Sequence, residues 1–264
     1  MLELKNIRKV FNPGTINEKI ALDGLNLTLK DGDFVTVIGG NGAGKSTMLN
    51  AIAGVWKPDQ GSVIIDGMDI TAMPEHKRAQ FLGRVFQDPM QGTAANMQII
   101  ENLSLANRRG KRRSLAWGIH KREREQYREL LASLDLGLET RLTTKVGLLS
   151  GGQRQAITLL MAAMNQPKLL LLDEHTAALD PKTAAKVLEI TDRIVQSSNL
   201  TTLMITHNMK DAIAHGNRLI MMHEGRVIAD VEGEAKKKLT VEDLLELFVQ
   251  ASGKEFTNDR AILS

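Results

Sequence analysis

The sequence predicts an α/β protein with a mainly parallel sheet, an antiparallel β subdomain at its amino-terminal end and an inserted helical subdomain. Three observations predict this class. The apolar run Phe34–Ile38 leads into a glycine-rich loop and a helical pattern. After residue 166, strand-like and helical segments alternate, beginning with the continuous apolar run Leu169–Leu172. Between about residue 90 and residue 165, apolar residues recur with a helical period.

The composition is that of an ordinary globular protein. The 264 residues are 42% hydrophobic, which is enough for a substantial core. The net charge of +3, from 34 Lys and Arg against 31 Asp and Glu, is too small to indicate an anionic partner by itself. Cysteine is absent, which excludes a disulfide framework, thiolate metal sites and a cysteine nucleophile.

Neither an export signal nor a membrane span is expected. The segment Met1–Asn6 lacks the basic and apolar regions of a secretory signal. The most apolar windows, Ile157–Met164 and Leu169–Leu172, are much shorter than the roughly 20 residues that a membrane-spanning helix needs. If the protein serves a membrane process, another chain must cross the bilayer.

The first 33 residues and the residues after 58 predict the antiparallel β flank. Leu2–Ile7 and Leu25–Leu29 are strand-like runs, separated by the turn signal Asn12–Gly14. Ser62–Gly67 is typical of a strand that ends in an Asp-Gly turn.

The segment Gly39–Thr47 matches the phosphate-loop pattern G-x-x-x-x-G-K-[ST] at every fixed position. Glycines allow backbone N–H groups to approach phosphate oxygens, and the following helix directs its partly positive end at them. Lys45 supplies a charge for the terminal phosphates, and Ser46 supplies a hydroxyl for magnesium. We therefore predict a P-loop NTPase core whose nucleotide-binding residues are Gly39, Asn41, Gly42, Ala43, Gly44, Lys45, Ser46 and Thr47.

Periodicity predicts the remaining elements. The helix after the loop buries Met48, Leu49, Ile52 and Ala53 and stops at Gly54. A short strand is expected at Arg84–Asp88, leading into Pro89. Further helices are expected at Asn96–Arg108, Lys121–Leu136, Gln153–Asn165, Lys182–Ser197 and Val241–Val249, and a further strand at Thr201–Thr206.

Two acids close the apolar run Leu169–Leu172. In a chain that binds a triphosphate, Asp173 can hold magnesium through water, and Glu174 can polarise the attacking water. Isolated from a phosphate loop, the same pair would be a solvated strand end. We therefore predict Asp173 as a metal ligand and Glu174 as the catalytic base.

The pentapeptide Leu149–Gln153 has the sequence Leu-Ser-Gly-Gly-Gln. Together with the phosphate loop, Leu169–Glu174, Ala178–Asp180 and His207, it resembles the ATPase subunit of an ABC transporter, over roughly Leu2 to Val249. The resemblance implies that two copies bind head to tail and bury two ATP molecules. Each site then combines one copy's phosphate loop with the other copy's Ser150, Gly151, Gly152 and Gln153, which can present a hydroxyl and amides at a helix N-terminus.

The resemblance also assigns roles to four single residues, each with a simpler alternative. Gln87 corresponds to a glutamine that touches magnesium or water, or it is a polar strand end. His207 corresponds to a switch histidine at the γ-phosphate, or it is a surface residue. Asp180 corresponds to a contact with the opposite subunit, or it caps the helix after Pro181. Phe11 corresponds to the aromatic that stacks on adenine, or it packs in the core.

The expected domain organisation is a single ABC ATPase domain over residues 1–264. Residues of about 1–88 and 166–250 form the nucleotide-binding core with its β flank, about 89–165 form the helical subdomain with the signature, and 251–264 form a carboxyl-terminal tail. The implied cofactors are ATP and Mg²⁺, with Ser46, Gln87 and Asp173 as metal ligands.

One residue departs from the family pattern: His175 stands where proline usually follows the catalytic glutamate. Histidine does not fix the backbone as proline does, so the stiffness of this turn is open. The segment Asp173–Asp180 resembles ATPases that pair with permeases and lipoprotein receptors for amino acids, including aromatic ones.

A basic stretch lies in the helical region: Arg108, Arg109, Lys111, Arg112, Arg113, Lys121, Arg122 and Arg124 stand against the single acid Glu123. Such a run is commonly a solvated face. Alternatively it meets anionic headgroups or an acidic permease loop, since the helical insertion faces the permease in the family. Only Trp117 lies between the clusters, so nucleic-acid binding is not expected.

These observations predict an ATPase that energises solute import, peripheral on the cytoplasmic side of the cell membrane. The expected partners are a second copy of the chain, a transmembrane permease and, indirectly, an extracytoplasmic substrate-binding protein. The alternative is a soluble non-transport ABC ATPase that acts on nucleic acid or the ribosome. A regulatory subunit without turnover is disfavoured because Glu174 and His207 are both present.

Overall fold

A computed structural model describes residues 1–111 and 118–252, and it confirms the predicted α/β class. The chain divides into two compact units, which we describe separately. Unit 1 comprises Met1–Arg78 and Leu200–Ser264, and unit 2 comprises Ala79–Asn199. The expected helical subdomain falls within unit 2, and its exact limits stay a prediction. The expected tail lies almost entirely outside the described residues.

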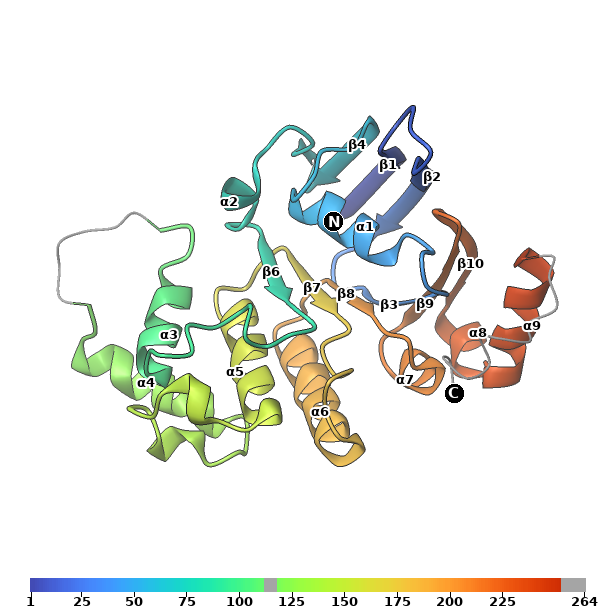
Figure 1. Cartoon of the computed structure of the whole chain (residues 1–264). Helices are drawn as coiled ribbons and strands as arrows, with labels where there is room; N and C mark the ends of the chain where they lie inside the picture. Colours follow the sequence, from blue (N-terminus) through green and yellow to red (C-terminus); the bar gives the residue numbers. More distant parts are fainter. Residues whose placement is uncertain (112–117, 253–264) are drawn as a thin grey trace. The chain divides into compact units, whose positions relative to one another are not determined.

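The amino-terminal part of unit 1 is the predicted antiparallel sheet, with strand order β2-β1-β4-β5 (Figure 1). The turn Asp66–Gly67 joins its last two strands, and both turn residues have positive φ, 49° and 76°. This backbone suits the right-handed twist of a hairpin, as the Asp-Gly signal predicts. The strands are β1 Leu2–Phe11, β2 Lys19–Leu29, β4 Gln60–Ile65 and β5 Met68–Asp69.

The second sheet of unit 1 is built on β3 (Phe34–Ile38), the predicted strand before the phosphate loop. β3 pairs in parallel with β8 (Thr202–Ile205) and β9 (Arg218–His223), and β10 (Arg226–Glu232) pairs antiparallel with β9. All five residues of β3 are buried. This is the burial expected of a central strand that is covered on both faces.

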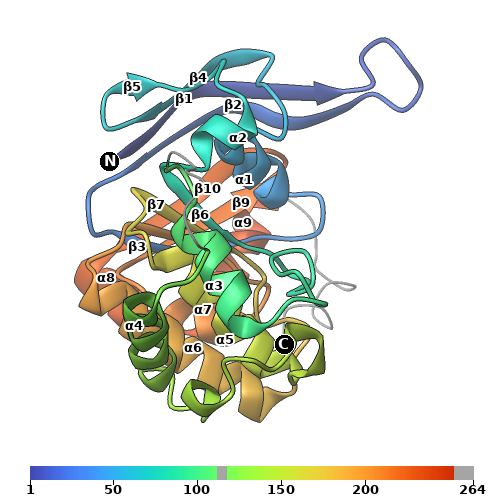
Figure 2. The same cartoon turned by 90° about the vertical axis from the view of Figure 1, so that its left-hand side faces the viewer.

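Helices cover both faces of this second sheet. α1 (Lys45–Ala53) lies between it and the antiparallel sheet, and α7, α8 and α9 lie on the other side (Figures 1 and 2). The predicted amphipathic helix is confirmed as α9, whose Leu244 and Phe248 pack against Met221. The remaining helices of unit 1 are α2 Glu75–Arg78, α7 Met209–Ala214, α8 Gly233–Lys237 and α9 Val241–Ser252.

The carboxyl end of α1 is held by a buried arginine. Arg78 Nη1 donates to the carbonyls of Ala51 and Ile52, each at 2.8 Å. These are carbonyls that a helix end leaves without an intrahelical partner. Gly54 ends the helix as predicted, with φ +85°, and a Cβ there would lie 2.7 Å from Arg78 Nε. Glycine is therefore required both for the turn and for the close approach of the guanidinium.

Unit 2 contains a parallel strand pair and the helical region. β6 (Leu82–Val85) pairs with β7 (Leu169–Asp173), and α5 packs on β6 and on α6 (Figure 2). A Cβ on Gly83 would lie 2.5 Å from the Ala162 carbonyl oxygen, so glycine lets α5 approach the strand. The helices are α3 Ile99–Asn107, α4 Lys121–Ala132, α5 Gly151–Ala163 and α6 Pro181–Ser197, with 3₁₀ turns at Leu138–Thr140 and Val146–Leu148. Among the described helices, none combines the length and apolarity needed to span a bilayer.

Several predicted boundaries are wrong. β1 and β2 extend beyond the predicted runs Leu2–Ile7 and Leu25–Leu29, and α3 begins three residues after the predicted Asn96. The strand expected at Arg84–Asp88 occupies Leu82–Val85, because its ladder runs beside Leu169–Leu172 and the chain then turns at Asp88, whose carboxylate accepts from the Met90 N–H. The helix expected at Lys121–Leu136 ends at Ala132. Beyond it, Asp135 and Gly137 have positive φ, 56° and 67°, which a right-handed helix does not allow.

Candidate nucleotide-binding and hydrolysis site

The phosphate loop connects β3 to α1 and is closely packed by other segments of unit 1. Gly39 and Gly44 have φ of +153° and +100°. A Cβ on Gly39 would lie 2.2 Å from the Met222 carbonyl oxygen, and one on Gly44 would lie 2.6 Å from that of Ala21. Any side chain would collide with the backbone at these positions. The glycines of the motif therefore serve the fold of the loop as well as its access to phosphate.

Lys45 is folded into this loop. Its side chain is buried, and Nζ donates to the carbonyls of Gly39 at 2.5 Å and Gly40 at 3.2 Å. Gly44 caps α1 without a side-chain hydrogen bond, so the partly positive helix end faces the loop. Asn41, Gly42 and Ser46 are exposed. The loop thus presents an ammonium, a helix N-terminus and an open hydroxyl, an arrangement suited to a phosphate chain.

His207 lies at the same edge of the sheet as the loop. It follows β8, and the Thr206 N–H donates to the Val37 carbonyl at 3.1 Å. Because β3 and β8 are parallel, their carboxyl ends share one edge. The histidine is exposed, and Asn208 behind it caps α7. Unit 1 therefore brings the predicted switch histidine and the phosphate loop together.

Phe11 is half-buried at the end of β1 and has two neighbours that the sequence did not indicate. Its ring meets Trp56 edge to face, with centroids 5.3 Å apart. Lys9 Nζ lies 5.7 Å from the Phe11 centroid, and an ion pair with Asp59 at 2.9 Å holds that lysine in place. Neither ring belongs to the buried core, so the contact with Trp56 is partly exposed. Core packing and adenine stacking both stay predictions.

In unit 2, Asp173 ends β7 and Gln87 follows β6. The strands are parallel, so both residues belong to the carboxyl edge of this pair. Arg84 was missed by the sequence analysis: its Nη2 lies 3.5 Å from Asp173 Oδ2. An arginine inside a short apolar strand, three residues before Gln87, was the available signal. It places a fixed positive charge beside the predicted metal ligand.

The turn after Asp173 is held by a buried histidine. Glu174 has φ +44°, an uncommon conformation for a residue with a side chain. His175 is only 2% exposed, and its Nε2 lies 3.0 Å from Thr191 Oγ1 on α6. The Thr191 hydroxyl donates its hydrogen to the Val187 carbonyl at 2.8 Å. Its oxygen therefore accepts the hydrogen bond from the His175 ring, whose N–H is at Nε2. The hydrogen bond from His175 to α6 thus anchors this turn, at the position where the family pattern has proline.

The signature forms the start of α5. Ser150 Oγ accepts from the Gln153 N–H, and Gln153 Oε1 accepts from the Ser150 N–H, both at 3.3 Å. Ser150 and Gly151 are exposed, whereas Gly152 is buried. A Cβ on Gly152 would lie 2.1 Å from Thr183 Cγ2 of α6. The second glycine is therefore needed for helix packing, and the first two residues are accessible to a partner.

Asp180 caps α6. Its Oδ1 accepts from the Thr183 N–H at 3.1 Å, and this hydrogen bonding to Thr183 lowers the pKa of the Asp180 carboxyl. The capping alternative is confirmed, and the contact with an opposite subunit stays a prediction.

The predicted residues thus divide between the units. Unit 1 holds Phe11, the loop and His207, and unit 2 holds Gln87, the signature, Asp173, Glu174 and Asp180. Ser46 and Asp173, both predicted metal ligands, fall in different units. Within the described ranges, no cluster of three or more His, Asp or Glu side chains forms a metal site by itself.

The chain is similar to transport ATPases over nearly its whole length. The family model described as ABC transporter matches residues 22–177. A tyrosine transport ATP-binding protein of Clostridioides difficile is 48% identical over 257 residues, which are 95% of this chain and 100% of that protein. A methionine import ATP-binding protein of Enterococcus faecalis is 35% identical over 87% of this chain, and the matched region spans 64% of that longer relative.

Solved structures agree with these relatives. The dimeric ATP-binding cassette MJ0796, in a post-hydrolysis state bound to ADP and Pi, has a TM-score of 0.74 at 31% identity, covering 88% of this chain and 98% of that one. The nucleotide motifs, the fold and these similarities lead to one conclusion. The chain belongs to the ABC transporter family, and it is an ATP-binding subunit that hydrolyses ATP.

Proposed function

We propose that this ATPase energises the import of an amino acid, with an aromatic one favoured, through a separate permease. The observation that carries the proposal is the 48% identity to a tyrosine transport ATP-binding protein along that protein's full length. Import ATPases among the other relatives support the direction of transport. They do not favour the alternative of a soluble ABC ATPase acting on nucleic acid or the ribosome.

In the proposed reaction, Lys45 and the loop amides bind the phosphates, and His207 contacts the γ-phosphate. Glu174 orients the attacking water and takes up its proton. Magnesium, when bound, neutralises phosphate charge. The oxygens of Ser46, Gln87 and Asp173 are of the type that it prefers.

Each site is completed by a second copy, bound head to tail. The exposed Ser150 and Gly151 at the start of α5 supply the hydroxyl and amides that face the other copy's nucleotide. The dimeric state of the similar cassette MJ0796 supports this arrangement. Gln87 and the helical region then transmit closure of the dimer to the permease.

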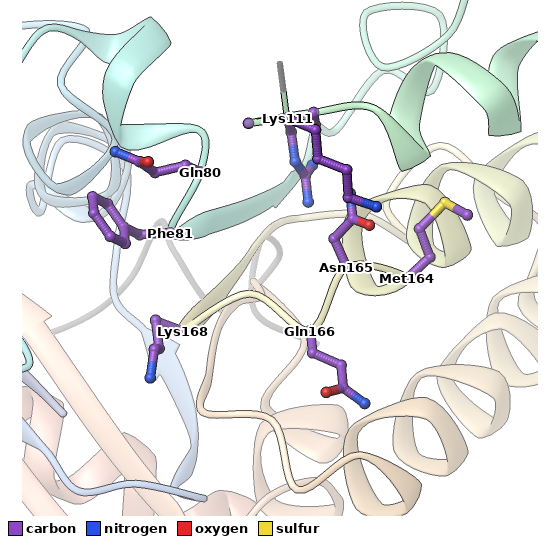
Figure 3. A pocket seen from close by; sticks show the side chains of 9 residues that line it. Gln80, Phe81, Lys111, Met164, Asn165, Gln166 and Lys168 are labelled. Atoms are coloured by element: carbon purple, nitrogen blue, oxygen red, sulfur yellow. The ribbon is translucent and has the colours of Figure 1, made fainter. Parts of the chain in front are cut away.

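A basic cavity in unit 2 is the proposed permease contact (Figure 3). Its volume is about 580 Å³, and none of its described lining residues is acidic. Arg109 donates to the Ala162 carbonyl at 3.0 Å near the end of α5, and burial lowers the pKa of its guanidinium. The carboxyl end of α5 carries about half a negative charge, which offsets only half of the positive charge of Arg109. An anionic group in the cavity would therefore stabilise Arg109 further. The lining residues are Gln80, Phe81, Arg109, Gly110, Lys111, Met164, Asn165, Gln166 and Lys168.

The residues of the basic stretch differ in their contacts. Arg108 is paired with Glu123 at 3.1 Å, so its charge is compensated within the fold. Lys111 is exposed at the cavity. Arg112, Arg113 and Trp117 lie outside the described residues. A concave site accepts a protruding acidic side chain better than a flat layer of headgroups. We therefore favour an acidic permease segment as the occupant, with the protein peripheral on the cytoplasmic side.

Reconstituted transport tests the function. The ATPase, its permease and a substrate-binding protein are placed in proteoliposomes, and uptake of labelled tyrosine, tryptophan, phenylalanine and methionine is measured. We expect ATP-dependent uptake, with an aromatic amino acid preferred. Uptake of methionine alone would contradict the aromatic assignment, and an ATPase activity that is insensitive to the permease would contradict the transport role.

Charge reversal at the cavity tests the permease contact. Lys111→Glu should weaken permease binding by about tenfold, equivalent to about 1.4 kcal/mol, because it replaces attraction by repulsion. Lys121→Glu is the matched control, since Lys121 is exposed in the same basic stretch but does not line the cavity. Binding is measured with permease in nanodiscs. Equal losses in both variants would indicate general charge attraction, and binding to permease-free anionic vesicles would favour headgroups.

A further inference from the structure

Lys19 is an exposed residue at the start of β2, and it lies outside the motifs identified in the sequence. In the ladder between β1 and β2, its Cα is the partner of the Phe11 Cα. Residues directly opposite each other in an antiparallel pair project from the same face of the sheet. Lys19 and Phe11 therefore project from one face.

The Lys19 side chain reaches the phosphate loop. A Cβ built on Gly42 would lie 3.1 Å from Lys19 Nζ, and Gly42 itself is exposed with φ +78°. The ammonium therefore lies against the backbone in the middle of the loop. Lys45 Nζ contacts the same loop at the Gly39 and Gly40 carbonyls. Two lysines, separated by 25 intervening residues in the sequence, thus bring positive charge to one loop.

The charge of Lys19 is not compensated within the fold. Across residues 1–111 and 118–252, no carboxylate forms an ion pair with it. The segment Gly39–Thr47 contains no acid either. An uncompensated ammonium beside a phosphate loop attracts an anion that binds there. A phosphate chain bound in the loop would provide that anion.

We infer that Lys19 is a second phosphate-binding lysine of the nucleotide site. This role of Lys19 rests on the proposed binding of the triphosphate by the loop, and it adds to the site a residue that lies outside the phosphate-loop motif. The β1–β2 ladder holds Lys19 and Phe11 at a fixed separation. If the adenine base stacks on Phe11, Lys19 reaches the phosphates of the same nucleotide. Its contribution depends on phosphate charge, not on the base.

The test compares Lys19→Ala, Lys19→Arg and Lys30→Ala in the full chain. Lys30 is exposed just beyond the other end of β2, so its variant removes the same charge at the opposite end of the strand from Lys19. Dissociation constants for ATP, ADP and adenosine are measured by competition with a fluorescent ATP analogue, at low and high salt. Lys19→Ala should weaken ATP and ADP by about tenfold, should leave adenosine unchanged, and should reduce the salt dependence of ATP binding.

The other outcomes are equally decisive. Lys19→Arg should retain most of the ATP affinity, and Lys30→Ala should retain all of it. Wild-type ATP affinity in Lys19→Ala, an equal loss in Lys30→Ala, or an equal loss for adenosine would each overturn the role of Lys19. A wild-type protein that fails to bind ATP would instead overturn the nucleotide site itself, so the two failures are distinguishable.

Discussion

Replacement of Glu174 by glutamine should reduce ATP turnover by about 10²–10⁴-fold, the contribution typical of a general base. The substitution keeps the shape of the side chain and removes its capacity to accept a proton. Glu174 directly follows β7, in a turn that the buried His175 anchors through Thr191. ATP binding should persist, because the phosphate loop is unchanged. Steady-state hydrolysis and calorimetric ATP affinity are the measurements.

The same variant should accumulate as an ATP-bound dimer, since closed sites would no longer reopen through hydrolysis. Size-exclusion chromatography with and without ATP detects this shift. Glu125→Gln is the control, because Glu125 is an exposed residue of α4 that forms a surface ion pair with Arg128. Undiminished turnover in the Glu174 variant would reject the assigned base. A monomer that hydrolyses ATP fully would reject the completion of the site by a second copy.

Replacement of Lys45 by alanine should weaken ATP binding by at least about 100-fold, corresponding to the loss of charged hydrogen bonds worth roughly 3 kcal/mol. The lysine ammonium is buried within the loop and contacts its carbonyls. No neighbouring loop residue carries a replacement charge. Turnover should fall with binding.

Thermal unfolding distinguishes lost binding from lost folding. ATP at 100 times its dissociation constant should stabilise the wild-type chain by about 2.7 kcal/mol. The Lys45 variant should unfold near the wild-type temperature without ATP, and the same ATP concentration should stabilise it by at most about 0.4 kcal/mol. The Lys30→Ala variant should keep the full shift, because Lys30 lies just beyond the end of β2 opposite to Lys19. A normal ATP shift in the Lys45 variant would contradict the loop assignment.

Local patterns were sufficient for the elements that position the chemistry. β3 occupies the predicted Phe34–Ile38, and β7 contains the predicted leucine run. All of β3 and the four leucines of β7 are buried, so a continuous apolar run is a sufficient signal. Gly54 and Asp66–Gly67 also end their elements as predicted, because positive φ is a property of single residues and their neighbours.

Other elements depended on longer-range pairing. β9 and β10 were not predicted, although the apolar run Leu219–Met222 is a signal that could have found β9. β10 is only partly buried and alternates weakly, so its formation depends on its ladder with β9. The sequence predicts the start of β6 two residues too late, because the limits of this strand follow its pairing with β7 and not its own composition.

The sequence by itself determined the family, the phosphate loop, the signature and the two strand-end acids, because each is a set of residue types at short spacing. Only the tertiary structure brought Lys19 to Gly42, Arg84 to Asp173 and His175 to Thr191. These contacts depend on strand register and helix packing. The β1–β2 ladder shifts register between Ile7, Lys9 and Val10, so simple alternation could not have placed Lys19 opposite Phe11. A second lysine at the phosphate loop is therefore a consequence of the fold, and not of the motif.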